Sequence, residues 1–369
     1  MKPYKPEKLP LNNIDWTRHV TLIGQANAAL ARYDGILQSI VNPWVLLSPL
    51  LANEAVISSR IEGTQATLKE VLQFEANPKE KIDPEKKADI QEVINYRKAM
   101  GEAVEKLKER PLCINLILDL HAVLMQGVRG RHRAPGEFRR SQNYIAPRGK
   151  PIEQAIFVPP SPEQVMPAMD NWEKYLHMEE KDPLVQLAVA KAQFELIHPF
   201  LDGNGRIGRM LVPIFLYYRK RLSSPMFYIS AYLDQNQETY YERLRAISSQ
   251  GDWNGWIEFF LKAISVQAES NTNKARAILH LYDEMKEKVP EITRSQHAVQ
   301  IIDFIFSLPI FSTTDFIKDT GISKTSSIRV LNAMKEKKII TSLIQGRGRR
   351  PELLMFPELI GIVQSESLM

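Results

Sequence analysis

The sequence of 369 residues lacks several features, and each absence excludes a class of protein. It has one cysteine, Cys113, so an internal disulfide and a CxxC metal site are excluded, and the apolar neighbours of Cys113 favour a buried, inert thiol. No apolar run approaches the roughly 18 residues needed to span a bilayer, so we expect no integral membrane protein. The phosphate-binding pattern GxxxxGK[ST] is also absent. If the protein binds phosphate, it therefore uses another device.

The start of the chain has no apolar stretch after its first lysines, so we expect no secretory signal and a cytoplasmic protein. Hydrophobic residues make up 44% of the chain and charged residues 25%, the balance of an ordinary globular protein. At roughly 150 residues per domain, the length predicts two or three domains.

Positive charge is concentrated in one stretch near the C-terminus. The net charge of the whole chain is +5, but Lys324 to Arg350 carries eight Lys or Arg residues against one acid, Glu336. The rest of the chain is therefore slightly acidic. Any attraction to nucleic acid belongs to this C-terminal stretch.

The spacing of apolar residues predicts a mainly α-helical protein. Helical periodicity covers residues 12–76, 90–107, 116–125, 236–248 and 253–268, and residues 184–197 are apolar nearly all round, as in a helix buried inside a bundle. A helix from Gly205 to Tyr217 should kink at Pro213. We expect four units: an N-terminal helical domain (1–100), a second, bundle-forming domain (101–268), a helical linker (269–295) and a C-terminal domain (296–369).

Two segments depart from the helical pattern. Ser141 to Ile145 and Ala155 to Val158 are rich in strand formers and flank Pro147 to Pro151, which predicts a β-hairpin with a basic tip. After His297, the pattern predicts two helices, a turn at Gly321, a third helix opened by Ser323 and two strands around a tip at residues 346–350. This is the order of a winged helix-turn-helix. We expect its third helix to bury Ile328, Leu331 and Met334.

The segment His198 to Arg209, which reads HPFLDGNGRIGR, gathers several chemical groups in twelve residues. Pro199 disfavours helical geometry at His198, so the buried helix should end there and leave the imidazole at a loop as a proton acceptor. Gly203 and Gly205 leave room in the turn, and the following helix directs its free N–H groups toward it. The turn is therefore a candidate anion cradle.

Charged side chains complete this segment. Arg206 and Arg209 are three residues apart, share one helix face and can grip further phosphate oxygens. Asp202 is a hard oxygen ligand suited to Mg²⁺ that bridges phosphates. A calcium loop fails on spacing, because Arg206 and Pro213 stand where oxygen ligands are needed. A plain turn is the other alternative, and the nine specified residue types that coincide here argue against it.

This segment resembles the signature H-P-F-x-[DE]-G-N-G-R-x-x-R of Fic proteins at every specified position. The resemblance extends over roughly residues 12–265, includes the stretch Gly130 to Tyr144, and implies a helical Fic bundle with a β-hairpin flap. It implies transfer of AMP from ATP, with Mg²⁺, to a Ser, Thr or Tyr hydroxyl of a target protein. His198 would be the base, and Asp202 would hold the metal. The implied ATP-binding residues are Glu62, Asp202, Gly203, Asn204, Gly205, Arg206, Ile207, Gly208, Arg209, Tyr240 and Tyr241.

The family also implies how the target and the loop are held. The hairpin, with Ala155, Ile156 and Phe157, would be a flap that pairs with an extended segment of the target and so positions its hydroxyl. Phe200 would anchor the loop in the core. Tyr240 and Tyr241 lie where the family places residues around the adenosine, although paired tyrosines in an amphipathic helix are more often simply half-buried.

Residues Ser58 to Gly63 match the pattern [ST]-x-x-x-E-[GN] of Fic proteins that restrain themselves. Ser58 and Glu62 share a helix face, and Gly63 is a natural helix terminator. Without the HPF segment, Glu62 would be an ordinary solvated residue near a helix end. With it, we expect Glu62 to pair with Arg209 and hold ATP in an unreactive pose.

Several alternatives stay open. Lys324, Thr325, Ser326 and Arg329, with Arg347, Arg349 and Arg350 at the tip, could grip DNA, but winged helices also serve as dimer or protein docking surfaces. A second hypothesis is a DNA-binding regulator whose Fic domain senses nucleotide or modifies itself. A third is transfer of another phosphate-linked group, or removal of AMP. The sequence leaves open whether the chain forms a homodimer.

Overall fold

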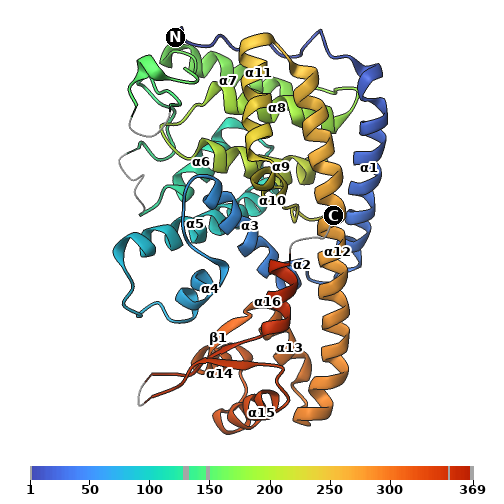
Figure 1. Ribbon diagram of the computed structural model, residues 1–369. Helices are drawn as coiled ribbons and strands as arrows, with labels where there is room; N and C mark the ends of the chain where they lie inside the picture. Colours follow the sequence, from blue (N-terminus) through green and yellow to red (C-terminus); the bar gives the residue numbers. More distant parts are fainter. Residues whose placement is uncertain (1, 128–132, 147–149, 348–349, 366–369) are drawn as a thin grey trace.

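The computed structural model describes residues 2–127, 133–146, 150–347 and 350–365, and Figure 1 shows its arrangement. The fold is mainly α-helical, as predicted, and the described residues form one small sheet. In chain order the elements are α1 (Trp16–Ser39), α2 (Pro43–Leu46), α3 (Ser48–Ile61), α4 (Leu68–Ala76), α5 (Pro84–Leu107), α6 (Ile114–Leu124), η2 (Ile152–Gln154), α7 (Pro162–His177), α8 (Pro183–Ile197), α9 (Asn204–Tyr218), α10 (Ser230–Gln235), α11 (Gln237–Gln250), α12 (Trp253–Thr293), α13 (Ala298–Ser307), β1 (Ile310–Ser312), α14 (Thr313–Thr320), α15 (Lys324–Glu336), β2 (Thr341–Ile344), β3 (Leu353–Met355) and α16 (Pro357–Gln364).

Helix α12 runs the length of the molecule and connects its two parts (Figure 1). The larger part holds α1 to α11, with α1 packed along α12, and the smaller part holds α13 to α16 and the sheet. The predicted helix from residue 253 ended at 268, but α12 is 41 residues long and runs on through most of the predicted linker to Thr293. Buried Gln267, Asn271 and Thr272 replace apolar residues on its inner face, which hid the continuity of the helix from the sequence pattern.

Helix α8 forms the centre of the larger part, as the sequence predicts. Asp182 caps it by accepting hydrogen bonds from the Leu184 and Val185 N–H groups at 2.9 and 3.1 Å, with Pro183 at the first helical position. Every residue of α8 is buried. The helix ends at His198, which has left-handed geometry (φ 51°), directly before Pro199. Its C-terminus therefore presents His198 to the loop that leads into α9.

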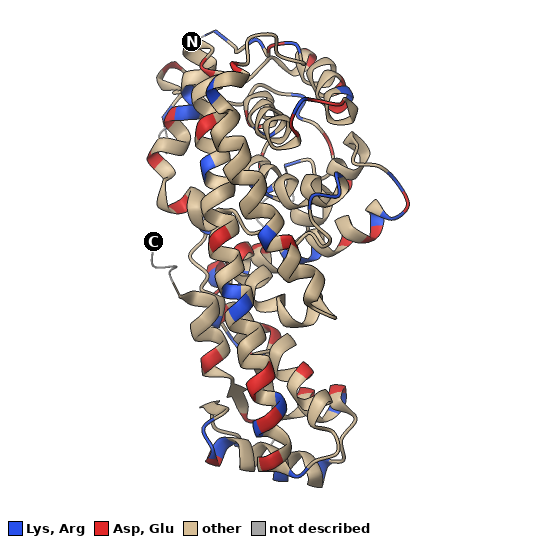
Figure 2. Ribbon diagram, turned by 90° about the vertical axis from the view of Figure 1, so that its right-hand side faces the viewer, with Lys and Arg blue, Asp and Glu red and all other residues tan. Residues whose placement is uncertain are grey.

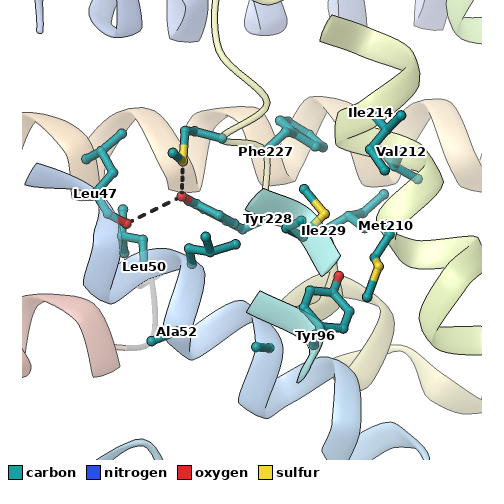
Figure 3. Close-up of a cluster of buried hydrophobic side chains, with 14 of the residues drawn as sticks. Leu47, Leu50, Ala52, Tyr96, Met210, Val212, Ile214, Phe227, Tyr228 and Ile229 are labelled. Carbon is teal, nitrogen blue, oxygen red and sulfur yellow. Dashed lines mark hydrogen bonds between the residues drawn. The ribbon is translucent and has the colours of Figure 1, made fainter. Parts of the chain in front are cut away.

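Helix α3 is fixed against α9 by a cluster of apolar side chains (Figure 3). Leu50 and Ala52 of α3 face this cluster, and Met210 lies on the α9 side. The Tyr228 hydroxyl donates a hydrogen bond to the Leu47 carbonyl at 3.4 Å. Because these side chains are almost completely buried, the position of the C-terminal end of α3 relative to α9 is set by packing.

The smaller part has the element order expected of a winged helix-turn-helix, with one strand more than predicted. The sheet order is β1-β3-β2, and both pairings are antiparallel. One burial prediction is wrong: Ile328 is 48% exposed. Helix α15 instead buries Ser327, Val330, Leu331 and Met334, a face in which a small polar residue takes the place of an apolar one.

Further differences from the sequence analysis are small. Helices α7, α10 and α16 were not predicted, and Cys113 is half-buried rather than buried, because it caps the exposed start of α6. In the part of the chain that the structure describes, no helix combines the length and apolar character needed to cross a membrane.

Candidate active site

His198 lies at the mouth of the loop between α8 and α9, where the backbone leaves the helix. Its Nδ1 lies 3.3 Å from the Glu195 carbonyl. A carbonyl only accepts hydrogen bonds, so Nδ1 carries the proton and Nε2 keeps its lone pair. Burial lowers the pKa of His198, which keeps the imidazole neutral near pH 7. The side chain is therefore prepared to accept a proton.

Arg139 holds the backbone around His198, a role that the sequence analysis missed. Its side chain donates hydrogen bonds to the His198 carbonyl at 2.9 Å and to the Pro160 carbonyl at 2.5 Å. Burial lowers its pKa to about 10, so it stays charged at neutral pH. The only signal in the sequence was its place in the stretch RAPGEFR at residues 133–139.

The loop after His198 is anchored by side chains rather than by regular structure. Asn204 Oδ1 accepts a hydrogen bond from the Phe200 N–H, and its Nδ2 donates to the Phe200 carbonyl, both at 2.8 Å. Phe200 is fully buried, as expected, and stacks on His121 with ring centroids 3.7 Å apart. His121 also lies 3.0 Å from the Asp202 carbonyl through Nε2. The sequence analysis did not identify His121.

The N-terminus of α9 faces a carboxylate from another part of the chain. Gly203 caps this helix with φ 80°, a conformation that favours glycine. A Cβ on Gly205 would lie 2.2 Å from Glu62 Oε1 and 3.0 Å from Arg209 Nη1. The Glu62 carboxylate thus occupies the space beside Gly205 where the positive end of the α9 dipole favours an anion.

Arg209 is 1% exposed and is held entirely by α3 and its end. Its Nη2 donates to Glu62 Oε1 at 2.6 Å and to the Ser58 carbonyl at 2.8 Å, and its Nε donates to Ser58 Oγ at 2.8 Å. Burial raises the pKa of Glu62, but the Arg209 charge outweighs this effect and the net pKa is lowered. The pair is therefore charged at neutral pH. Gly63 (φ 95°) ends this turn.

Arg206 is held by a second carboxylate that the sequence analysis missed. Its Nη1 lies 2.9 Å from Glu92 Oε2 on α5, and its Nη2 lies 3.3 Å from Asp202 Oδ1. The Thr64 hydroxyl also donates to Glu92 at 3.3 Å. Burial raises the pKa of Glu92, and Arg206 opposes that change. Both arginines of the segment are thus paired with acids from helices N-terminal to it.

Comparison with known proteins agrees with this geometry. Models described as "Fic/DOC family N-terminal" and "Fic/DOC family" match residues 20–105 and 111–216, together just over half of the chain. The chain belongs to the Fic/DOC family. Similar curated proteins include the protein adenylyltransferases Fic of Drosophila erecta, 28% identical over 209 residues, and of Drosophila grimshawi, 27% identical over 252 residues.

These relatives are much longer than the matched region. The matches cover 54% and 65% of this chain but only 37% and 44% of the two fly proteins. Among solved structures, a Fic family protein from Desulfovibrio desulfuricans G20 has a TM-score of 0.59 at 22% identity, covering 96% of this chain and 98% of that one. Fic-1 from C. elegans has a TM-score of 0.52 at 18% identity, covering 71% and 73%. These structures share the fold.

Within the Fic domain, Asp202 has the surroundings expected of a metal ligand. Its Oδ1 accepts the Gly203 N–H at 2.6 Å and faces Arg206, while 45% of the side chain stays exposed. Mg²⁺ is usually held by one or two carboxylates together with substrate phosphates and water. Among the described residues, no three or more His, Cys, Asp or Glu side chains are grouped so that they could hold a metal ion. The exposed carboxylate of Asp202 fits a metal held partly by phosphate, and its role as a metal ligand stays a prediction.

The two predicted adenosine residues have different surroundings. Tyr240 is 2% exposed, and its hydroxyl lies 2.9 Å from Lys191 Nζ and 3.3 Å from Glu195 Oε1. Tyr241 is 43% exposed. Lys191, which the sequence analysis missed, is itself paired with Glu195 at 3.1 Å. Tyr241 is therefore the better placed of the two for contact with a ligand.

Ile207 and Gly208 lie on the buried side of α9. Ile207 is 1% exposed, and a Cβ on Gly208 would lie 2.3 Å from Glu195 Oε1. Gly208 therefore allows close contact between α9 and α8, and Ile207 is part of the core. Their predicted part in ATP binding stays a prediction.

The two segments predicted to form the flap hairpin do not form a regular two-stranded ladder. The described residues show one antiparallel bridge, Ile145 to Phe157, and a short 3₁₀ helix in place of a ladder. Pro159 and Pro160, directly after the second segment, have no N–H donors, and a two-stranded hairpin alone is marginal in water. Residues 147–149 of the predicted tip lie outside the described residues. Ile145 and Ile156 are about 40% exposed, while Ala155 and Phe157 are partly buried.

The basic surface of the smaller part is only partly as expected. Lys324, Thr325 and Arg329 are exposed on α15, and Ser326 is partly buried. Arg347 is exposed, Arg350 pairs with Glu80 at 3.0 Å, and Arg349 lies outside the described residues. Figure 2 shows acidic residues interspersed with the basic ones at this end of the molecule. DNA binding stays a prediction.

Proposed function

We propose that this chain transfers AMP from ATP to a hydroxyl group of a protein, and that Glu62 restrains the reaction. The observation that carries the proposal is the convergence on one loop of a neutral imidazole, a helix N-terminus and two buried arginines. Family membership supports the same reaction, since curated relatives are named protein adenylyltransferases.

In the proposed reaction, the hydroxyl oxygen of a Ser, Thr or Tyr attacks the α-phosphorus of ATP. The bond from this phosphorus to the bridging oxygen breaks, and pyrophosphate leaves. His198 Nε2 takes the hydroxyl proton, which makes the oxygen a better nucleophile. Backbone N–H groups at the start of α9 stabilise the charge that develops on the α-phosphate.

Two charged groups hold the leaving part of ATP. Arg206 and Arg209 bind the β- and γ-phosphates once their carboxylate partners give way. Asp202 would hold Mg²⁺, which neutralises phosphate charge when bound. Tyr241 borders the adenosine, and Ile145 and Ile156 of the flap offer an exposed edge to an extended target segment.

Glu62 would restrain the reaction because its carboxylate and the phosphates of ATP compete for the same position. The Glu62 carboxylate lies beside Gly205 and on Arg209, where phosphate oxygens would otherwise bind. Two anions cannot share this place without strong repulsion. ATP therefore binds in an unreactive pose, or weakly, until Glu62 moves.

Intact-mass spectrometry after incubation with Mg²⁺ and ATP tests the proposal. We compare the wild type, Glu62→Gly, and Glu62→Gly combined with His198→Asn. Asparagine tolerates the left-handed backbone of residue 198 and cannot act as the base. A gain of one AMP mass or more in Glu62→Gly alone is expected.

The other outcomes decide between the alternatives. A gain of a different mass would indicate transfer of another phosphate-linked group. If no variant gains mass, even with candidate target proteins added, the DNA-binding regulator is the better hypothesis. Its own test is salt-sensitive binding to a DNA duplex that is lost when Arg347, Arg349 and Arg350 are replaced.

A further inference from the structure

A cavity of about 530 Å³ lies where α3, α10, α12 and α16 meet, and its wall includes neither His198 nor Arg206 nor Arg209. Its wall includes Arg60 and Thr64, which stand on either side of Glu62 in the sequence. Lys274 of α12 and Gln364 at the end of α16 line other sides. The volume falls within the roughly 300–1,000 Å³ of small-molecule sites. The cavity therefore joins the restraining helix to the smaller part of the molecule.

The cavity has one positive charge that no described carboxylate neutralises. Arg60 is paired with Asp234 at 2.5 Å, so these two charges compensate each other. Lys274 Nζ, in contrast, donates to the Val363 carbonyl at 3.0 Å and forms no ion pair with a described residue. Burial lowers its pKa, which reflects the loss of water around the ammonium group. An anion beside Lys274 would restore that lost stabilisation.

Uncharged polar groups line much of the remaining wall. The amide side chains of Asn53, Gln65, Gln235 and Gln364 form no hydrogen bond with the rest of the described chain. Amides both donate and accept, so they match hydroxyl groups on a ligand. Apolar residues such as Val56 and Ile57 form a comparable part of the wall, which suits the carbon skeleton of a ligand.

We propose that this cavity binds a small organic anion, with a carboxylate or phosphate on Lys274 and hydroxyl groups on the surrounding amides. We further propose that the bound anion strengthens the restraint by Glu62, a point that rests on the proposed function. The cavity is open while Glu62 is paired with Arg209 at 2.6 Å. A ligand that fits this arrangement favours it over one in which the end of α3 has moved.

Ligand-observed saturation-transfer NMR tests binding without any assumption about activity. The probes are gluconate, glucose 6-phosphate and glucose, which differ in carrying a carboxylate, a phosphate or neither. We expect saturation of at least one anion at millimolar concentration, and none of glucose. The anion that binds identifies the acidic group preferred. Equal saturation of glucose, or none of either anion, would overturn the proposal.

Variants locate the site. Lys274→Gln should reduce saturation of the anion at least fivefold, whereas Lys262→Gln, an exposed lysine on the same helix, should not. Ala231→Leu, which fills the cavity without touching the Lys274 contact, should also reduce it. Anion binding that survives both cavity variants would overturn the assignment.

Two further arms complete the experiment. Residues 366–369 follow the rim residue Ser365 and lie outside the described residues, so binding is also measured on a chain that ends at Ser365. Binding that appears only in the shortened chain would overturn the proposal. For regulation, the bound anion should lower the AMP-transfer rate of the wild type severalfold and leave Glu62→Gly unchanged. Equal inhibition of both would overturn the regulatory part alone.

Discussion

Replacement of Glu62 by glutamine should have opposite effects on activity and stability. Glu62→Gln keeps the shape of the side chain and removes the charge that pairs with Arg209 at 2.6 Å. Arg209 keeps its two hydrogen bonds to Ser58, both at 2.8 Å, so it stays in place to receive a phosphate. The variant therefore leaves Arg209 in position and removes the negative charge that opposes phosphate binding.

The magnitude follows from the burial of the pair. A charge-assisted hydrogen bond contributes roughly 1.5–3 kcal/mol, and about 1.4 kcal/mol is tenfold, so the transfer rate should rise about 10- to 100-fold. Glu62 is 36% exposed, which places the effect toward the lower end because solvent screens the pair. Breaking a buried pair costs roughly 3–5 kcal/mol, and with this exposure we expect a loss of about 1–3 kcal/mol of unfolding free energy.

The assay combines initial rates of label transfer from ATP with urea unfolding of the same preparations. Glu75→Gln is the matched control, because Glu75 also lies 2.6 Å from an arginine, Arg97, but away from the site. The control should also lose some unfolding free energy, because its pair is partly buried, but its transfer rate should not rise. Added ATP should restore stability to Glu62→Gln, since binding to the folded state stabilises it. If Glu62→Gln were destabilised without a rise in transfer rate, the proposed restraint by Glu62 would be wrong.

Three further predictions concern residues around the site. Burial raises the pKa of Glu54 to about 7, so the folded state binds the Glu54 proton more tightly than the unfolded chain does. The free energy of unfolding should therefore fall by up to about 3 kcal/mol as pH rises from 4.5 to 7. Urea unfolding at several pH values measures this change, and Glu54→Gln should abolish it. Glu92→Gln should raise ATP affinity of the Glu62→Gly protein about tenfold in calorimetric titration, by freeing Arg206. Gly203→Ala should lower unfolding free energy by more than about 1 kcal/mol, and by more than Gly251→Ala, since both have positive φ but only Gly203 has neighbours within 4 Å.

Local patterns in the sequence were enough to predict the core of the candidate site. Pro199 fixes the end of α8, and the apolar residues all round α8 predict its burial. The features of α8 depend on neighbours within one or two helical turns. The pairing of Glu62 with Arg209, by contrast, was implied by the resemblance to Fic proteins; the structure shows this pair and adds two hydrogen bonds from Arg209 to Ser58.

Contacts between distant segments could not be predicted in this way. Glu92 is 114 residues from Arg206, and His121 is 81 residues from Asp202, so no periodicity links them. Arg139 acts on backbone carbonyls, which carry no sequence signal. The missed strand β1 has three residues and forms only because β3 lies beside it. Packing of separate helices determines all of these.

The central claim is that His198 drives transfer of the AMP part of ATP once Glu62 is removed. The most direct test incubates Glu62→Gly with ATP labelled on the α-phosphate and, separately, on the γ-phosphate, and measures label retained on protein. We expect Glu62→Gly to retain the α-label only, to lose it when His198→Asn is added, and the wild type to carry little label. Retention of the γ-label, or of the α-label without His198, would contradict the claim.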